Sequence, residues 1–203
     1  LMKLKFSSYF YPLSKKNYIM TKLLFPLLFI VFFQTLNAQF LADNQNTTQQ
    51  KGLFNFHYDK KADKVFLEVK HLDKEFLYVN ALSEGIGSND IGLDRGQLGD
   101  GVVVNFKKAG NKLLLVQPNQ KFRAITKNDD ERKSIEEAFA KSIIFGFPIK
   151  EIKDEKHIID LTPFLLRDAH HVSKRLKDNL QGSYKLDASR NVLWLENTKA
   201  FPK

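Results

Sequence analysis

The stretch LSEGIGSNDIGLDRGQLGDG, from Leu82 to Gly101, contains six of the ten glycines in the 203-residue sequence. It separates two runs with β-strand character, residues 75–81 and 102–106. Such a density of glycine indicates a shaped loop with several tight turns, because glycine tolerates positive φ and close backbone approach. Apolar residues recur within the loop, at Ile86, Ile91, Leu93 and Leu98. A flexible linker has little use for apolar anchors, so the sequence predicts an ordered loop.

Short alternating runs on both sides of this loop predict further strands. Residues 53–58 and 65–69 form one expected hairpin, and residues 76–79 form a third strand before the loop. After the loop we expect strands at 102–106 and 112–116 around the turn Gly110-Asn111, then at 147–152, 157–161 and 192–195. Short, closely spaced strands of this kind favour an antiparallel sheet.

Two segments have the spacing of amphipathic helices. Asn128 to Asp130 can cap a helix whose apolar positions are Ile135, Ala138, Phe139, Ser142 and Ile143, with Gly146 and Pro148 ending it. Thr162-Pro163 starts a second helix, which continues through Leu165, Ala169, Val172 and Leu176. The predicted fold class is therefore α+β: a mostly antiparallel sheet of five or more short strands with two amphipathic helices packed on it.

The first 38 residues have the pattern of a secretory signal peptide. A short basic segment begins at Met20, an apolar run extends from Leu23 to Phe33, and Ala38 supplies the small residue before a cleavage point. The apolar run is too short for a bilayer core, which needs about 20 residues. We expect translation to start at Met20, residues 1–19 to be an upstream extension, and the mature chain to begin near Gln39. A retained membrane anchor is the alternative.

The composition of the remaining residues indicates how the rest of the chain is organised. Residues 39–51 are rich in Gln, Asn and Thr and are predicted to be a polar mobile arm, followed by a single α+β domain over residues 52–203. The formal net charge of +9 falls to +4 without the five lysines of residues 1–38. This mild excess is spread along the chain and indicates no nucleic-acid partner. The sequence has no cysteine, which excludes disulfides, thiolate zinc ligands and a cysteine nucleophile.

The glycine loop is the candidate binding site. Its polar residues are Ser88, Asn89, Asp90, Asp94, Arg95 and Gln97. No third glycine completes a dinucleotide fingerprint and no Gly-Lys-Ser/Thr follows, so phosphate binding is disfavoured. The Asp and Asn oxygens suit calcium in type but do not have EF-hand spacing. The favoured interpretation is that these side chains cap turns and that Arg95 pairs with Asp90 or Asp94.

No catalytic or metal-binding residue is predicted. A zincin needs two histidines one helical turn apart with a glutamate beside the first. His170 and His171 are adjacent, so on a helix they point about 100° apart, and positions 174 and 175 are Lys and Arg. An exposed or capping pair of His170 with Asp168 is the favoured interpretation.

Several motifs resemble the N-terminal non-catalytic region of large secreted bacterial zinc-dependent metalloproteases. They cover nearly everything after about Gly52 and lie at residues 75–80, 87–97, 113–119, 164–170, 182–190 and 198–202. In that family the region is a domain of unassigned function upstream of the catalytic domain.

The resemblance implies that residues 52–203 are an accessory domain, truncated at its C-terminal boundary. We expect no cofactor in this chain and zinc only in the missing catalytic domain. The expected partner is the downstream protease domain of the same polypeptide, with no stable membrane span after signal cleavage. The implied location is the periplasm, the outer surface or the medium. The alternative is a stand-alone secreted binding module whose loop 82–101 holds a glycan, a peptide or a surface partner.

The sequence leaves open how the loop is held. Ile91 and Leu93 are expected to be partly buried, either against the chain's own sheet or against the downstream domain. The second arrangement is favoured because a loop so rich in glycine has few local contacts.

Overall fold

The computed structural model describes residues 46–87 and 89–201. The chain separates into two units at Asp43 and Asn44, and every described residue belongs to the second. The predicted signal peptide and the first part of the predicted arm lie outside the described residues. Within the described part, no helix combines the length and the apolar content needed to cross a membrane.

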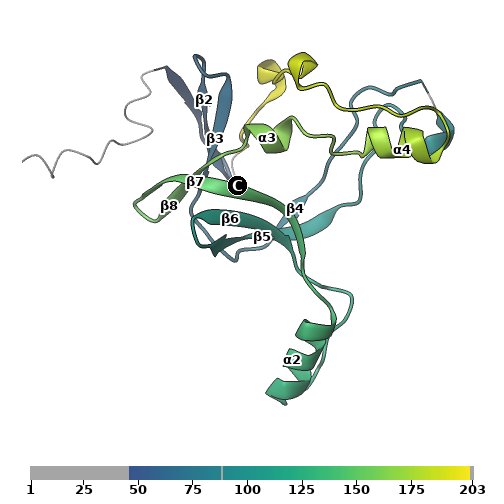
Figure 1. The fold of residues 1–203 in the computed structure, drawn as a ribbon. Coiled ribbons are helices and arrows are strands. Elements are labelled where there is room, and N and C mark those ends of the chain that lie inside the picture. Colours follow the sequence, from purple (N-terminus) through teal and green to yellow (C-terminus); the bar gives the residue numbers. More distant parts are fainter. Residues whose placement is uncertain (1–45, 88, 202–203) are drawn as a thin grey trace, which may run out of the picture. The chain divides into compact units, whose positions relative to one another are not determined.

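The fold is mostly β, with a few helices, and so belongs to the predicted α+β class. Among the described residues, eight strands form one antiparallel sheet in the order β1-β2-β3-β8-β7-β6-β5-β4 (Figure 1). The strands are β1 (Thr47–Gln50), β2 (Asn55–Asp59), β3 (Lys64–Val69), β4 (Phe76–Tyr78), β5 (Val102–Ala109), β6 (Lys112–Gln117), β7 (Ser142–Lys153) and β8 (Lys156–Asp160). The expected hairpin of β2 and β3 is confirmed, and the predicted neighbouring strands β5 with β6 and β7 with β8 also pair.

Two predictions about strands are wrong. Residues 47–50, placed in the mobile arm, form β1 and pair with β2 in register from Thr47↔Asp59 to Gln50↔Phe56. Residues 192–195 form no strand, and their last residue opens the 3-10 helix η3 (Leu195–Asn197). Polar composition alone misassigned β1, because its side chains are largely exposed and it forms one edge of the sheet.

Strand β7 is longer than predicted and joins two halves of the sheet. Its first part pairs with β6 as far as Lys112↔Pro148, and its second part pairs with β8 from Ile149↔Ile159. Proline has no N–H to donate, and Pro148 lies where β7 passes from one partner strand to the other. The predicted helix was expected to reach Ile143, but residues 142–149 belong to β7. Their β-branched and aromatic side chains favour a strand.

The sheet curls around a single apolar core. The Phe54 ring, just before β2, lies 5.0 Å between centroids from Phe76 of β4 and 6.0 Å from Phe106 of β5. Five strands separate β2 from β4 in the sheet, so this contact requires the two ends to face one another. The buried cluster comprises Phe56, Val65, Leu67, Val69, Val104, Phe106, Leu113, Leu115, Phe147, Ile159 and Phe164. Each large side chain buried there contributes about 1.5–3 kcal/mol.

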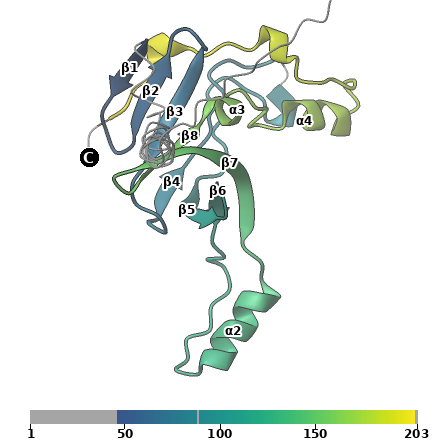
Figure 2. The ribbon, with the colours of Figure 1, turned by 60° about the vertical axis from the view of Figure 1, so that its left-hand side comes forward.

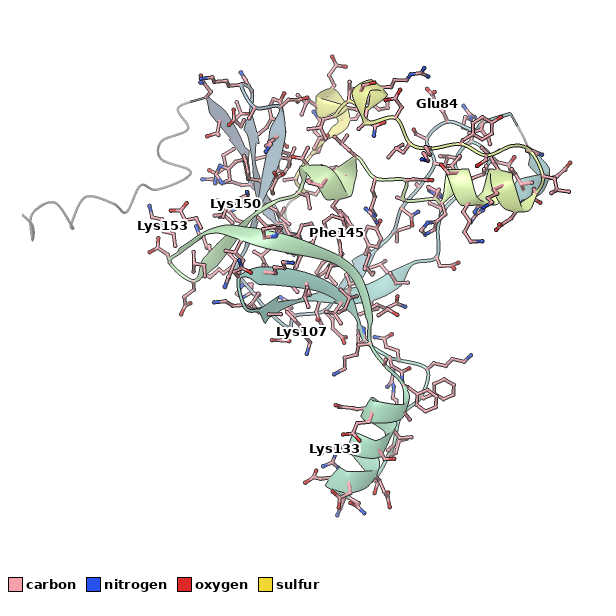
Figure 3. All side chains as sticks on the ribbon, in the orientation of Figure 1. Glu84, Lys107, Lys133, Phe145, Lys150 and Lys153 are labelled. Carbon is pink, nitrogen blue, oxygen red and sulfur yellow. The ribbon has the colours of Figure 1, made fainter. Side chains whose placement is uncertain are left out.

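The structure does not confirm two amphipathic helices packed on the sheet. Helix α2 (Asp129–Ala138) has the predicted Asn128 cap but no buried residue. It lies on the connection between β6 and β7, beyond the end of the sheet (Figure 2), and its side chains, Lys133 among them, project outward (Figure 3). Its apolar contact is the stack of Phe139 on Phe122, with ring centroids 4.1 Å apart.

The second predicted helix is divided in two. Helix α3 (Thr162–Leu165) places Phe164 on the core, 5.4 Å from Phe145 and 5.6 Å from Tyr78 between ring centroids. Helix α4 (Val172–Asp178) begins after His171, whose left-handed φ of 53° separates the two segments. Asp168 caps α4, because its carboxylate accepts from Val172 N (2.8 Å) and Ser173 N (3.0 Å).

Candidate functional site

The glycine loop continues the pairing of β4 with β5. Leu82 N donates to Gln97 O (2.9 Å), Gly96 N to Leu82 O (2.7 Å) and Gly99 N to Asn80 O (2.8 Å). A single bridge pairs Ala81 with Leu98. The two sides of the loop are thus hydrogen-bonded to one another, and the short 3-10 helix η1 (Asn89–Ile91) lies near its tip. These hydrogen bonds hold the described parts of the loop, residues 82–87 and 89–101, in a defined conformation.

Local contacts also anchor the loop to its own domain. Leu93 is fully buried, at 0% exposure, and Ile91 is half-buried. Arg175 of α4 donates from Nη1 to the carbonyl of Gly92 (2.8 Å) and, at 3.4 Å, to that of Ile91. The expectation that this loop has few local contacts is therefore wrong. An apolar anchor and a guanidinium tether hold it without a second domain.

The predicted site residues lie on the outer part of this loop. Ser88 and the side chain of Asn89 lie outside what the structure describes. Asp90 and Arg95 are exposed, while Asp94 and Gln97 are half-buried. Among the described side chains of this set no ion pair or hydrogen bond joins one to another, so the expected pairing of Arg95 with Asp90 or Asp94 is absent. Gln97 Nε2 donates instead to the neighbouring Leu98 O (3.4 Å).

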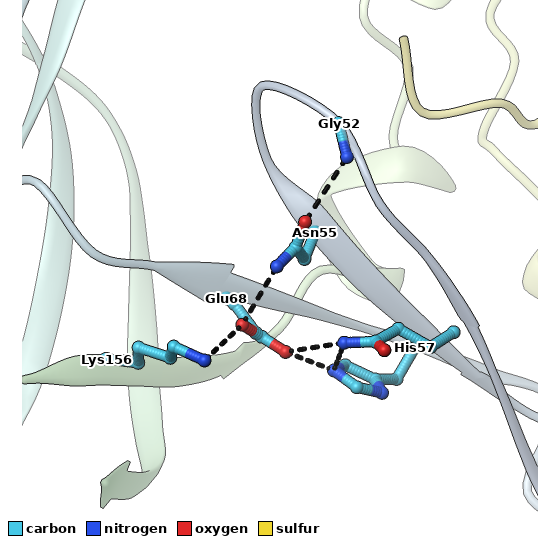
Figure 4. Close-up of polar contacts among 6 residues, drawn as sticks. Gly52, Asn55, His57, Glu68 and Lys156 are labelled. Atoms are coloured by element: carbon cyan, nitrogen blue, oxygen red, sulfur yellow. Dashed lines mark hydrogen bonds and ion pairs between the residues drawn. The ribbon is translucent and has the colours of Figure 1, made fainter. Parts of the chain in front are cut away.

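A buried carboxylate cluster, which the sequence did not indicate, lies on the face of β2, β3 and β8. Glu68 of β3 accepts on one oxygen from His57 Nε2 (2.5 Å) and Gln49 Nε2 (3.1 Å). The other oxygen accepts from Asn55 Nδ2 (3.3 Å) and lies 3.4 Å from Lys156 Nζ. Figure 4 shows Glu68 between His57, Asn55 and Lys156. The register places Asn55, Glu68 and Ile158 side by side, so the cluster connects four neighbouring strands.

The chemistry of this cluster is structural. Burial alone raises the pKa of Glu68, but the hydrogen bonds from His57 and Asn55 and the charge of Lys156 outweigh it, and the net pKa lies below the ordinary value. A carboxylate has about four lone-pair positions; three hydrogen bonds reach Glu68, and Lys156 forms an ion pair with it at 3.4 Å. Burial and these contacts favour a structural role for Glu68, which also lines a pocket of about 220 Å³.

The buried histidines lie on separate parts of the described structure. His57, His157 and His170 are buried, but they lie on β2, on β8 and before α4. Within residues 46–87 and 89–201, no group of three or more His, Asp or Glu side chains is placed to hold a metal ion. His170 was expected to be exposed or to cap a helix with Asp168. Asp168 is indeed a cap, but His170 is buried.

Exposed apolar side chains gather along the C-terminal segment, residues 179–201. Its regular structure consists of the 3-10 turns η2 (Ala188–Arg190) and η3. The segment is fastened at its end, where Leu53 N donates to Phe201 O (2.8 Å) and Ala200 N to Gln50 Oε1 (3.1 Å). Six large apolar side chains are more than half exposed along it: Leu180, Tyr184, Leu186, Val192, Trp194 and Phe201. Groups of exposed apolar residues are typical of surfaces that bind a partner.

Comparison with known proteins gives two family matches. The family described as "Domain of unknown function (DUF5117)" matches residues 96–203, and the one described as "Domain of unknown function (DUF5118)" matches residues 38–85. No curated protein and no solved structure matches the chain. The two matches meet in the glycine loop. The first contributes β5 to β8 and the second β1 to β4, and both sets of strands belong to one sheet.

Proposed function

The chain belongs to the family of the domain of unknown function DUF5117, and from this premise and its sequence motifs we propose that it is the N-terminal accessory domain of an exported zinc-dependent metalloprotease. In this proposal the chain has no peptidase activity of its own. The zinc ion and its His-Glu-x-x-His helix belong to a catalytic domain encoded downstream. The leader directs export to the periplasm, the outer surface or the medium.

The observation that carries the proposal is the exposed apolar surface of the C-terminal segment. Trp194, the single tryptophan of the sequence, is 60% exposed, and Val192 is 80% exposed. Aromatic residues of this kind are typical centres of protein interfaces. The occupant we propose is the catalytic domain that follows in the same polypeptide. Covering this segment would assist folding of the protease or fix its position.

The first test is to read the gene beyond Lys203 for His-Glu-x-x-His in the same frame. The second is to measure binding between the exported chain and the polypeptide encoded downstream. We expect Trp194→Ser and Val192→Ser each to weaken binding at least tenfold. Ile125→Ser is the matched control, because Ile125 is fully exposed but lies on the connection before α2. A frame that ends without the motif, or equal binding by all three variants, contradicts the proposal.

A stand-alone binding module is the second candidate. The surface of loop 82–101 favours it, because the loop carries exposed apolar residues, Ile86 and Leu98, as well as the exposed Asp90 and Arg95. A surface of this composition suits a glycan, a peptide or a surface partner. The two candidates separate in one binding experiment. If the module hypothesis holds, substitution of Arg95 and Leu98 abolishes binding of the glycan, peptide or surface partner of the loop. If the accessory-domain hypothesis holds, the same substitution leaves binding to the downstream polypeptide unchanged.

A further inference from the structure

A pocket of about 250 Å³ lies between the base of the glycine loop and the segment that leads into α4. Tyr78 and Asn80 line one side, and Arg167, His170 and Arg175 line the other. Val102 of β5 and Ile144 of β7 add an apolar wall. No member of the predicted loop site lines this pocket, and the pocket lies apart from the Glu68 cluster.

Arg167 is fixed in place but has donors to spare. Its Nη1 donates to Phe164 O (2.6 Å) and its Nη2 to the hydroxyl of Tyr78 (2.8 Å). The guanidinium also stacks on the Phe164 ring, 3.6 Å from the centroid. A guanidinium has five N–H donors in a rigid plane, so two hydrogen bonds leave three unused. This side chain is therefore oriented in advance for a planar acceptor.

Arg175 is in a similar position on the other side of the pocket. Its Nη1 donates to the loop carbonyls of Gly92 and Ile91, and within residues 46–87 and 89–201 its other N–H groups have no acceptor. Among the described residues, neither Arg167 nor Arg175 forms an ion pair with a carboxylate. The two guanidiniums thus place positive charge on one pocket, and neither is paired with a described carboxylate.

His170 adds an unsatisfied polar group. It is 7% exposed, and its Nε2 is buried without a hydrogen-bond partner among the described residues. Buried polar atoms nearly always have a partner. One carboxylate, that of the exposed Asp100, lines the same pocket. Its carboxylate is a hydrogen-bond acceptor, whereas most other groups that line the pocket are hydrogen-bond donors or apolar.

We propose that this pocket binds the free C-terminal carboxylate of a peptide whose last residue is apolar. Arginine is suited to carboxylates because its planar fork donates two parallel hydrogen bonds. In the last residue of such a peptide, the carboxylate and the apolar side chain are attached to the same Cα. The carboxylate suits the guanidiniums of the pocket, and the side chain suits the adjacent apolar wall of Val102 and Ile144. The adjacent peptide N–H matches the acceptor Asp100. An Asp or Glu side chain has only one or two methylene groups beside its carboxylate and matches less well.

The inference is independent of the metalloprotease proposal, and its test uses the exported chain with ligands added in solution. The probes for calorimetric titration are acetyl-Gly-Gly-Leu with a free carboxylate, its C-terminal amide, acetyl-Asp amide and inorganic phosphate. We expect the free acid to bind at least tenfold more tightly than each of the other three. Equal binding of the amide, or tighter binding of acetyl-Asp amide or phosphate, overturns the inference.

Variants then locate the site. Arg167→Lys and Arg175→Lys keep the charge but lose the planar fork, and each should weaken binding of the free acid at least tenfold. Arg123→Gln is the control, because this exposed arginine does not line the pocket. Unchanged affinity in both lysine variants overturns the inference. If a lysine variant fails to fold, the four probes on the unsubstituted chain still decide.

Discussion

Glu68 shows how one residue joins four strands. Its two oxygens connect Gln49 of β1, His57 and Asn55 of β2, and Lys156 of β8 to its own strand β3. Removal of the charge leaves several of these donors without an acceptor, which costs about 1–3 kcal/mol in a buried site. The stability of the sheet should therefore depend on the ionisation of this carboxyl.

We expect Glu68→Gln to lower the free energy of unfolding by about 1–3 kcal/mol at neutral pH. The pKa of Glu68 is lowered in the folded chain, so its contribution is present above the unfolded pKa of about 4.3 and is lost as the pH falls through the folded pKa. The difference between the two proteins should shrink below about pH 4. Denaturant unfolding across that range measures it. A difference that grows on acidification would contradict the assignment.

Gly92 and Gly96 provide a second prediction for single residues. Both have left-handed φ, 68° and 79°, so a β-branched side chain at either position should cost about 1–3 kcal/mol through backbone strain. A Cβ on Gly96 meets nothing within 4 Å, whereas a Cβ on Gly92 lies 2.9 Å from Arg175 Nη1.

Gly92→Val should therefore also break the arginine tether and expose the loop to limited proteolysis, while Gly96→Val should lower stability alone. Thermal melting and the rate of cutting within residues 85–95 measure the two effects. Equal cutting of both variants would contradict a role for the tether.

At the scale of elements, the sequence predicted strands better than helices. Alternation and turn residues identified β2, β3, β5, β6 and β8, because each has an apolar face on one core. The helical spacing at Ile135, Phe139 and Ile143 was misleading, because Ile143 is in β7 and Phe139 packs on Phe122 instead of on the sheet. The spacing of apolar residues within one segment does not show which distant part of the chain covers the apolar face of a helix.

The same limit applies to the candidate sites. Glycine content predicted an ordered loop, but the Glu68 cluster and the arginine pocket assemble residues far apart in sequence, such as Tyr78 with Arg167. No local motif marks such contacts.

The stability of helix α2 should depend on local contacts and not on the core of the sheet. A ten-residue helix without buried residues is marginal alone, and its apolar support is the ring stack of Phe122 and Phe139. We expect Phe139→Ala to speed amide hydrogen exchange in residues 129–138 about tenfold and to leave exchange in β6 unchanged. Lys133→Ala on the same helix is the control. Faster exchange throughout the sheet in Phe139→Ala would show that α2 is part of the core.

At the scale of the whole molecule, two family matches form one structural unit. The part matching DUF5118 supplies β1, β2 and β3 at one end of the sheet and β4 at the other. The part matching DUF5117 supplies the four strands between them. Neither part can complete the core, since Val65 and Leu67 come from one and Phe106 and Phe147 from the other.

This arrangement predicts the behaviour of a chain divided within the glycine loop. Residues 39–88 and 89–203, produced separately, should each lack a cooperative thermal transition. In each piece β3 or β8 has an unpaired edge, and the core side chains lose those of the other piece. When mixed, the two pieces should associate and recover the circular dichroism spectrum of the intact chain. The division falls between Ser88 and Asn89, outside the paired residues 80–82 and 96–99, so the loop ladder can re-form. Cooperative melting of residues 89–203 alone would show that the DUF5117 part is an independent domain and that the strands before it are an addition to a complete sheet.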